Sequence, residues 1–131
     1  YYWTLDEDGE AVNYEINASN IRGFFFNLEN NHPLVFGNAC ASTTGLAKGH
    51  LKGLGPVCLN LGASAYIGTL APITRSMAPR FASEFFRQLL HVGLPIGEAL
   101  MATKESLQGN ADPSWLFYCL YGSPDTCFVL E

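Results

Sequence analysis

The chain has 131 residues, of which 48% are hydrophobic and 13% aromatic. This is enough apolar material for one domain with a packed core, and it excludes a disordered tail. The net charge of −5 includes only seven Lys and Arg residues. These cations are scattered, so we expect no direct contact with nucleic acid, because phosphate recognition needs clustered cations. No apolar run approaches the roughly 18 residues of a membrane span, so we expect no membrane association either.

The first segments predict a hairpin and a helix. Residues 1–16 alternate loosely around Asp8-Gly9, which is a strong two-residue hairpin signal. The acidic cluster in this turn lacks the Gly and the terminal Glu of a calcium-binding loop, so a solvated turn is favoured over a metal site. From Asn17 or Ser19, apolar residues at helical spacing continue to Leu28, and this pattern predicts a helix that residues 30–33 end.

Two buried strands follow, separated by a glycine-rich loop and a short helix. The segment Leu34 to Asn38 has no polar alternation, so we expect both of its faces to be covered, as in a parallel sheet between helices. The glycines of residues 45–55 match no nucleotide-binding order. Residues 56–61 read as a short helix that Gly62 ends, and a second buried strand is predicted from Ala65 to Leu70.

The second half of the chain predicts two long helices and a third strand. Between Met77 and His91, apolar residues recur every four positions and polar residues occupy the opposite face. Pro95 opens another helix that Gly109 ends. Residues 114–121 read as a third strand. This order predicts an α/β fold: a three-layer sandwich with a mostly parallel sheet flanked by helices.

The four cysteines favour a reducing, cytoplasmic compartment. They form no CxxC pair and no zinc-like spacing with histidine, and a disulfide framework is not expected beside so large a core. Nothing in the sequence calls for a metal or an organic cofactor. Two cysteines lie within apolar segments, where cysteine behaves as a small hydrophobic residue. They are Cys58 and Cys119; the others are Cys40 and Cys127.

Cys40 is placed differently, two residues past the expected end of the first buried strand. Ligands of open α/β sheets bind at the carboxyl ends of strands. The small neighbours of Cys40 in "NACAS" leave a thiol accessible and let backbone N–H groups approach a substrate carbonyl. A nucleophilic thiolate also needs a base or cation nearby. From position alone, Cys40 is either a nucleophile or a small structural residue.

Four ordered blocks resemble the CHAT family of caspase-like cysteine peptidases, which in bacteria are commonly attached to tetratricopeptide repeats. The resemblance covers about Pro33 to Thr126. It consists of a hydrophobic strand ending in Asn-x-Cys, a Gly-Ala turn into the next strand, an aromatic-rich helix followed by a Gly-Glu-Ala-Leu helix, and a closing Trp…Gly-x-Pro segment. The blocks are "PLVFGNACAS", "LGASAYIGTLAPIT", "RFASEFFRQLLHVGLPIGEAL" and "DPSWLFYCLYGSPDT".

This resemblance implies a cysteine endopeptidase that works through a Cys/His dyad. Cys40 would attack a peptide carbonyl to form an acyl-enzyme, and nearby backbone N–H groups would hold the oxyanion. The implied substrate-binding residues are Asn38, Ala39 and Ala71. Relatives that cut after Arg or Lys carry Asp at the place of Asn38, so the neutral amide argues against a strongly basic P1 preference.

Two departures from the family pattern leave an alternative open. The family's His-Gly motif is absent, and Ala71 stands where many members have Trp. His32 is eight residues from Cys40, or roughly 26 Å along a strand. His91 ends a helix, where the helix dipole favours a cation. His50, in the loop after Cys40, could approach it. We therefore expect the catalytic histidine outside this chain; the alternative is an inactive caspase-like scaffold or interaction domain.

The start of the chain, Tyr1-Tyr2-Trp3 without an initiator Met, adds an expectation about organisation. We expect residues 1–131 to be the C-terminal, Cys-bearing part of a caspase-like domain whose N-terminal strands lie elsewhere. The partners implied are that N-terminal half, a tetratricopeptide-repeat or sensor region, and a protein or peptide substrate.

Overall fold

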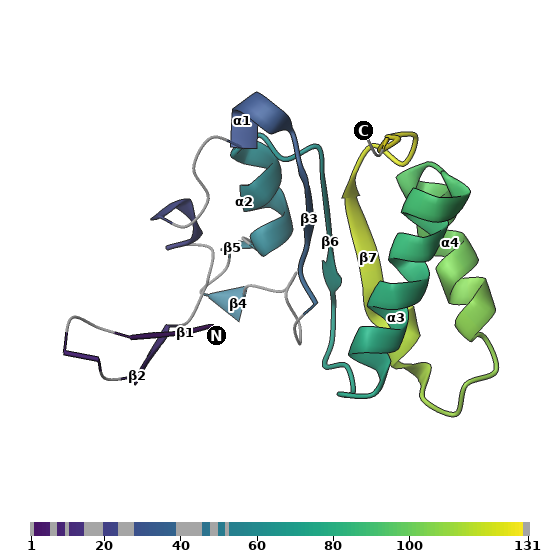
Figure 1. Ribbon diagram of the computed structural model, residues 1–131, viewed down its shortest axis with the longest axis horizontal. Coiled ribbons are helices and arrows are strands. Elements are labelled where there is room, and N and C mark those ends of the chain that lie inside the picture. The colour runs from purple at the N-terminus through teal and green to yellow at the C-terminus, as the bar shows by residue number, and fades with distance from the viewer. Residues whose placement is uncertain are drawn as a thin grey trace.

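A computed structural model describes residues 2–5, 8–9, 11–14, 20–23, 28–38, 46–47, 50–51 and 53–129. Its centre is a three-stranded sheet in the order β3-β6-β7 (Figure 1). The strands are β3 (Leu34–Phe36), β6 (Ala65–Thr69) and β7 (Tyr118–Gly122). β3 runs parallel to β6, and β7 runs antiparallel to it. The described sheet is therefore mixed, and the expected mostly parallel sheet is wrong for these strands.

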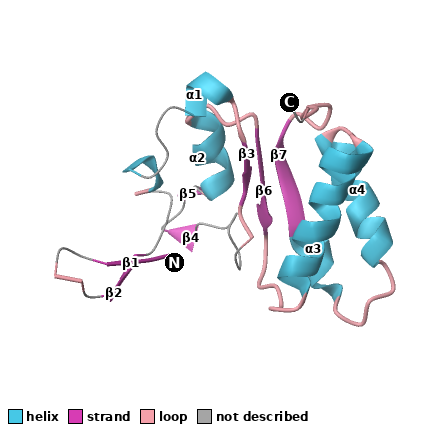
Figure 2. Cartoon of the chain, in the orientation of Figure 1, coloured by secondary structure: helices cyan, strands magenta, loops and turns pink. Residues whose placement is uncertain are grey.

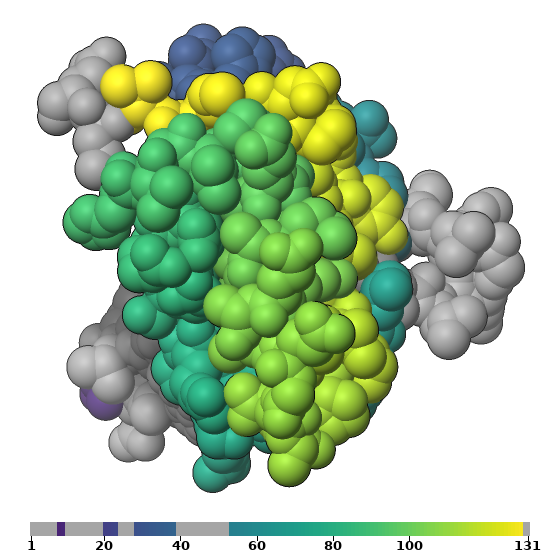
Figure 3. All heavy atoms as spheres, turned by 90° about the vertical axis from the view of Figure 1, so that its right-hand side faces the viewer, coloured from purple at the N-terminus to yellow at the C-terminus, as the bar shows by residue number. Residues whose placement is uncertain are grey.

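Helices cover both faces of this sheet, which confirms the expected helix–sheet–helix layering (Figure 2). One face carries the short helices α1 (Leu28–Asn31) and α2 (Leu54–Asn60). The other carries α3 (Met77–Phe86) and α4 (Ile96–Leu107). Figure 3 looks onto this second layer, where α3 and α4 lie side by side and the C-terminal residues, in yellow, border them.

The alternation of side chains along β6 divides the interior into two clusters. All five residues of β6 are buried. Ala65 and Ile67 pack with α3 and α4, whereas Tyr66 packs with α1 and α2. Successive residues of a strand point to opposite faces, so one fully apolar strand supplies both clusters. The interpretation of this segment as a strand covered on both faces is confirmed.

β3 is also covered on both faces, although its residues are only partly buried. Val35 packs against the cluster of α1 and α2, while Leu34 and Phe36 pack against the cluster of α3 and α4. The ring centroid of Phe36 lies 5.4 Å from that of Phe85 and 5.2 Å from that of Phe86. Aromatic contacts at this spacing add to the burial of apolar surface.

The long amphipathic helix is confirmed and is built around one buried row. The row contacts the sheet at every fourth position, and its members are Met77, Phe81, Phe85 and Leu89. Beyond α3 the chain continues as a π-helical segment (Arg87–Val92), and it ends at Gly93, where φ is +80°. Pro79 is tolerated because it lies in the first turn, where its missing N–H removes no helical hydrogen bond.

The end of the chain closes the amino end of α4. The N–H groups of Ile96 and Gly97 donate to the carbonyl oxygens of Thr126 and Pro124, both at 2.9 Å. A Cβ atom at Gly97 would lie 2.6 Å from the Cβ of Pro124. The glycine is therefore required for this close approach, and two N–H groups that a helix leaves unpaired find partners.

The first third of the chain contributes two hairpins and a short turn. β1 (Tyr2–Leu5) and β2 (Ala11–Tyr14) pair antiparallel, and Gly9 in their turn has a φ of +79°. The predicted hairpin is confirmed. β4 (Leu46–Ala47) and β5 (His50–Leu51) pair within the glycine-rich segment. The helix expected up to Leu28 is represented by a 3-10 turn, Ile21–Gly23, and by α1; residues 24–27 lie outside the described part.

The third strand begins later than the sequence predicts. Residues Pro113–Phe117 form a 3-10 helix, and only Tyr118–Gly122 are extended. Pro113 occupies the first position of that helix, and the Asp112 side chain accepts a hydrogen bond from the N–H of Ser114 at 2.9 Å. This cap and proline start a helix locally, and they override the extended preference of the aromatic residues that follow.

Within the described residues, no helix combines the length and the apolar character needed to cross a bilayer.

The buried row of α3 leads to a stability prediction. Phe85 is 0% exposed and stacks on Phe36, so Phe85→Ala should lower the free energy of unfolding by about 3–5 kcal/mol, through lost burial and the cavity left behind. Urea unfolding followed by circular dichroism measures this change. Ser83→Ala, at an exposed position of the same helix, is the control and should change stability little; equal effects of the two variants would contradict the assigned core.

Candidate active site

The candidate site begins where β3 leaves the sheet. The last hydrogen bond of β3 to its neighbour joins the N–H of Gly37 to the carbonyl oxygen of Ile67, at 2.7 Å. Asn38 follows directly and is exposed. Ala39 and Cys40, both predicted site residues, lie outside the described residues. Asn38, two residues before Cys40, therefore lies at the carboxyl end of β3, a strand that runs parallel to its neighbour β6.

The side chain of Asn38 links this strand end to two other elements. Its Nδ2 donates to the carbonyl oxygen of Ala78, in the first turn of α3, at 2.9 Å. Its Oδ1 accepts a hydrogen bond from the hydroxyl of Tyr118, at the start of β7, at 2.5 Å. An amide has two N–H donors and an oxygen that accepts twice. One donor and one acceptor position of Asn38 are thus used internally, and the other donor and acceptor positions have no partner among the described residues.

Tyr118 was not among the residues that the sequence singled out. It is 1% exposed, and its ring stacks on Phe81 with centroids 3.6 Å apart and planes 5° apart. The sequence signal is a tyrosine within an apolar segment, since a buried tyrosine hydroxyl needs a hydrogen-bond partner. That signal did not identify the partner, which is 80 positions away in the sequence.

Ala71, the third predicted substrate-binding residue, follows β6. The N–H of Leu70 donates to the carbonyl oxygen of Phe117 at 3.0 Å, and Ala71 beyond it is partly buried. Because β3 and β6 are parallel neighbours, Asn38 and Ala71 both follow strands that end at the same end of the sheet. The structure therefore brings these two predicted residues to one end of the sheet.

A polar network fixes the loop between β6 and α3. The Thr74 hydroxyl donates to one carboxylate oxygen of Asp112, and it accepts from the N–H of Met77 at 3.2 Å. The other carboxylate oxygen of Asp112 accepts from the N–H of Ser114. The hydrogen bonds from Thr74 and then from Ser114 lower the pKa of Asp112, because they stabilise its charged form. The network joins the loop that carries Ala71 to the segment before β7.

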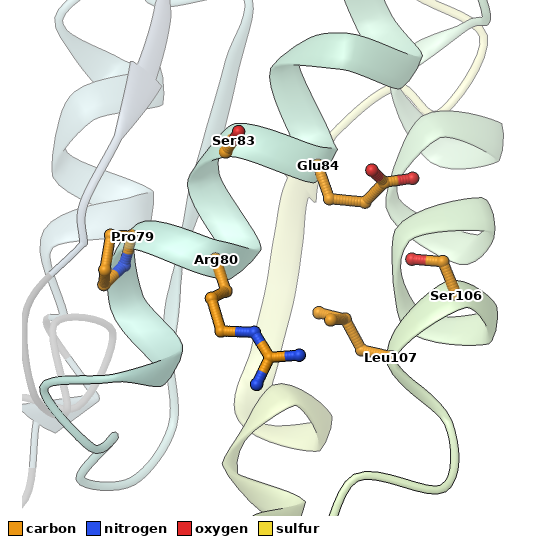
Figure 4. Close-up of a pocket in the computed structure, with 6 residues that line it drawn as sticks. All are labelled: Pro79, Arg80, Ser83, Glu84, Ser106 and Leu107. Atoms are coloured by element: carbon orange, nitrogen blue, oxygen red, sulfur yellow. The ribbon is translucent and has the colours of Figure 1, made fainter.

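A separate groove of about 510 Å³ lies on the outer side of the helix layer, between α3 and α4 (Figure 4). Arg80 and Glu84 of α3 face Ser106 and Leu107 of α4 across it. Glu84 is held by Arg87 at 2.6 Å, and this contact lowers the pKa of the Glu84 carboxyl to about 2. Neither Asn38 nor Ala71, the two predicted site residues that the structure describes, lines this groove.

The other cysteines and the histidines do not supply a second thiol site in the described residues. Burial raises the pKa of the Cys58 thiol to about 11, which keeps it protonated. The Cys119 thiol lies 3.6 Å from the carbonyl oxygen of Gly68. His32 Nδ1 lies 3.0 Å from the carbonyl oxygen of Gly62, before the start of β3, so it is at the opposite end of the strand from Asn38. No group of metal-binding side chains occurs in the described part.

Comparison with known proteins shows the family. The family model described as the CHAT domain matches residues 5–122. The chain therefore belongs to the CHAT domain family, whose kinship is with caspase-like cysteine peptidases, and the predicted resemblance is confirmed. No curated protein and no solved structure gives a significant match to the chain.

The cysteine environments predict selective alkylation. Cys58 is 0% exposed, with its thiol pKa raised to about 11, whereas Cys127 is exposed. In the folded protein at neutral pH, iodoacetamide should modify Cys127 and leave Cys58 unmodified, because the thiolate is the reactive form. Peptide mass spectrometry measures both, and the same reaction in urea should modify Cys58. Modification of Cys58 under native conditions would contradict its burial.

The Asp112 network predicts a pH-dependent contribution to stability. The folded-state pKa of Asp112 is lowered, so its contribution is present above the unfolded-state pKa and is lost as the pH falls through the folded-state value. Asp112→Asn should lower the Tm near neutral pH, and the difference should shrink between about pH 5 and about pH 3. Thermal melts across this range measure it. Asp125→Asn, in an exposed turn, is the control; a difference that is constant with pH would contradict the assignment.

Proposed function

We propose that this protein is a cysteine endopeptidase of the caspase-like type, with Cys40 as its nucleophile. The observation that carries the proposal is the CHAT domain match over residues 5–122. Within this match, Asn38 ends a strand whose neighbour β6 is parallel and buried, two residues before Cys40. A loop at the carboxyl end of a parallel strand is where α/β folds carry their ligand-binding residues.

The proposed reaction is peptide-bond hydrolysis in two steps. The Cys40 thiolate adds to the carbonyl carbon of the scissile bond, and the bond to nitrogen then breaks with proton transfer to the leaving amine. Water attacks the resulting thioester, which releases the new carboxylate and restores the thiol. A histidine outside this chain is the proposed general base, and backbone N–H groups beside Cys40 are the proposed oxyanion donors.

Asn38, Ala39 and Ala71 are the proposed residues of the substrate pocket. The position of Asn38 and Ala71 at one edge of the sheet supports this assignment. Asn38 retains one N–H donor and one acceptor position for a substrate. It carries no charge, so it supplies no ion pair for an Arg or Lys at P1, and Ala71 leaves room beside it.

We also propose the wider organisation of the protein. The mixed sheet with helices on both faces is compatible with a caspase-like sandwich, in which residues 1–131 are the C-terminal, Cys-bearing part. The proposed partners are the N-terminal half of that sandwich, a tetratricopeptide-repeat or sensor region that regulates cleavage, and a protein substrate. A cytoplasmic location is part of the proposal, because the spacing of the four cysteines suggests no disulfide framework.

The peptidase proposal predicts the effect of removing one sulfur atom. In the activated full-length protein, Cys40→Ala should abolish cleavage of its protein substrate, and an iodoacetamide probe should label Cys40 before the other cysteines. Gel analysis of the substrate and mass spectrometry of the labelled peptides measure these outcomes. Cys127→Ala, which removes an exposed cysteine, is the control and should cleave normally. Cleavage retained by Cys40→Ala would remove the peptidase assignment.

A non-catalytic scaffold is the second candidate. The observation that favours it is the position of His32 and His91: the first contacts Gly62 before β3, and the second lies near the end of the π-helical segment after α3. Neither lies at the strand end that precedes Cys40. A full-length protein whose Cys40 reacts no faster than Cys127, and which cleaves nothing, would establish this candidate.

A further inference from the structure

We propose that Asn38 and Tyr118 form a latch that fixes the carboxyl end of β3, two residues before Cys40, to β7 and helix α3, and that this contact positions Cys40 for reaction; this inference rests on the proposed function. The latch is defined as the two hydrogen bonds of the Asn38 side chain, to the Ala78 carbonyl oxygen and from the Tyr118 hydroxyl. Its members come from three elements that meet at one edge of the sheet. Asn38 and Tyr118 are thus positioning residues, and they act on the reaction through Cys40.

The reach of the backbone explains why a contact at Asn38 constrains Cys40. The sheet ladder of β3 ends with the hydrogen bond of Gly37 to Ile67, and the latch holds the very next residue. Cys40 is only two residues further along the chain, and each residue adds one Cα–Cα step of about 3.8 Å, so little backbone separates it from the fixed Asn38. Fixing Asn38 therefore restricts where the thiol can be placed, whereas a free Asn38 would let the loop move from the ladder outward.

The latch is attached to the buried core. Tyr118 is 1% exposed and stacks on the fully buried Phe81. Tyr118 is also paired with Thr69 of the neighbouring strand β6. The hydroxyl therefore has little freedom to follow Asn38 outward. Close packing of this kind transmits position, because buried side chains occupy single rotamers with few voids around them.

The second partner, Ala78, ties the latch to the helix layer. Its carbonyl oxygen lies in the first turn of α3 and accepts from Asn38 Nδ2 at 2.9 Å. The same turn is held from the other side, because the N–H of Met77 donates to Thr74 Oγ1, which in turn contacts Asp112. The strand end before Cys40 and the loop after β6 are consequently fixed to one helix terminus.

The discriminating variant is Tyr118→Phe in the activated full-length protein. It removes the hydroxyl and keeps the ring on Phe81. We expect kcat to fall roughly 10- to 100-fold with KM within about twofold, as for a displaced reacting group. Tyr121→Phe is the matched control, since it lies in the same strand on the opposite face, and no hydrogen bond of its hydroxyl occurs among the described residues. It should behave as the wild type.

A double-mutant cycle and a thiol assay complete the test. Asn38→Ala should lower kcat at least as much as Tyr118→Phe, because it also removes the hydrogen bond to Ala78. The double variant should be no worse in kcat than Asn38→Ala, because the two groups act as one unit. If Asn38→Ala does not fold, Asn38→Asp replaces it, since it removes the donor to Ala78. In the same variants, the rate of Cys40 alkylation at neutral pH should fall relative to the wild type, while the rate of Cys127 alkylation stays unchanged.

The outcomes separate the latch from the peptidase proposal. Equal kcat and alkylation profiles for Tyr118→Phe and Tyr121→Phe would overturn the latch, as would a rise in KM with kcat unchanged, which would make the contact a substrate-binding one. Additive effects in the double variant would also overturn it. A wild type that cleaves nothing would overturn the peptidase, and the alkylation profiles would then decide the latch alone.

Discussion

The buried strand β6 is the centre of the described sheet, and both helix layers pack against it. It is covered along its whole length and pairs on both edges, with β3 in parallel and β7 antiparallel. Ala65 and Ile67 face one of the two hydrophobic clusters, and Tyr66 faces the other. An unpaired N–H or C=O group in a strand buried on both faces costs considerable free energy, because no water can replace the missing partner. The need to satisfy this strand therefore brings together segments from residues 34–36 and 118–122, and with them the ends that surround the candidate site.

At that end of the sheet, polar contacts take over from apolar packing. The rings of Phe81 and Tyr118 are stacked inside the core, while the Tyr118 hydroxyl reaches the Asn38 amide at its border. Thr74 and Asp112 join the neighbouring loop to the segment before β7. Loops that carry function need a rigid support, because small displacements of a reacting group are costly. The combination of a stacked aromatic core and a hydrogen-bonded rim is such a support.

Much of the fold could be predicted from local patterns, and the exceptions have local causes. Helix α3 and strand β6 can be recognised from their apolar residues alone, because the spacing of apolar residues indicates the type of element and which face is buried. The start of the third strand was misjudged, since Asp112 and Pro113 begin a 3-10 helix within an aromatic, strand-like segment. The sequence also predicts a mostly parallel sheet, whereas β7 is antiparallel to β6. An antiparallel partner for β6 depends on where the chain arrives after α4, and no residue within β7 encodes that arrival.

For the site, the family and the position of Cys40 after an apolar strand can be read from contiguous residues. The sequence also identified Asn38 and Ala71, whose positions after β3 and β6 follow from strand ends alone. Only the tertiary structure decided that the Asn38 amide is shared between Ala78 and Tyr118. The physical reason is range: a hydrogen bond across 80 residues depends on how three elements pack, and that packing is absent from any local stretch of sequence.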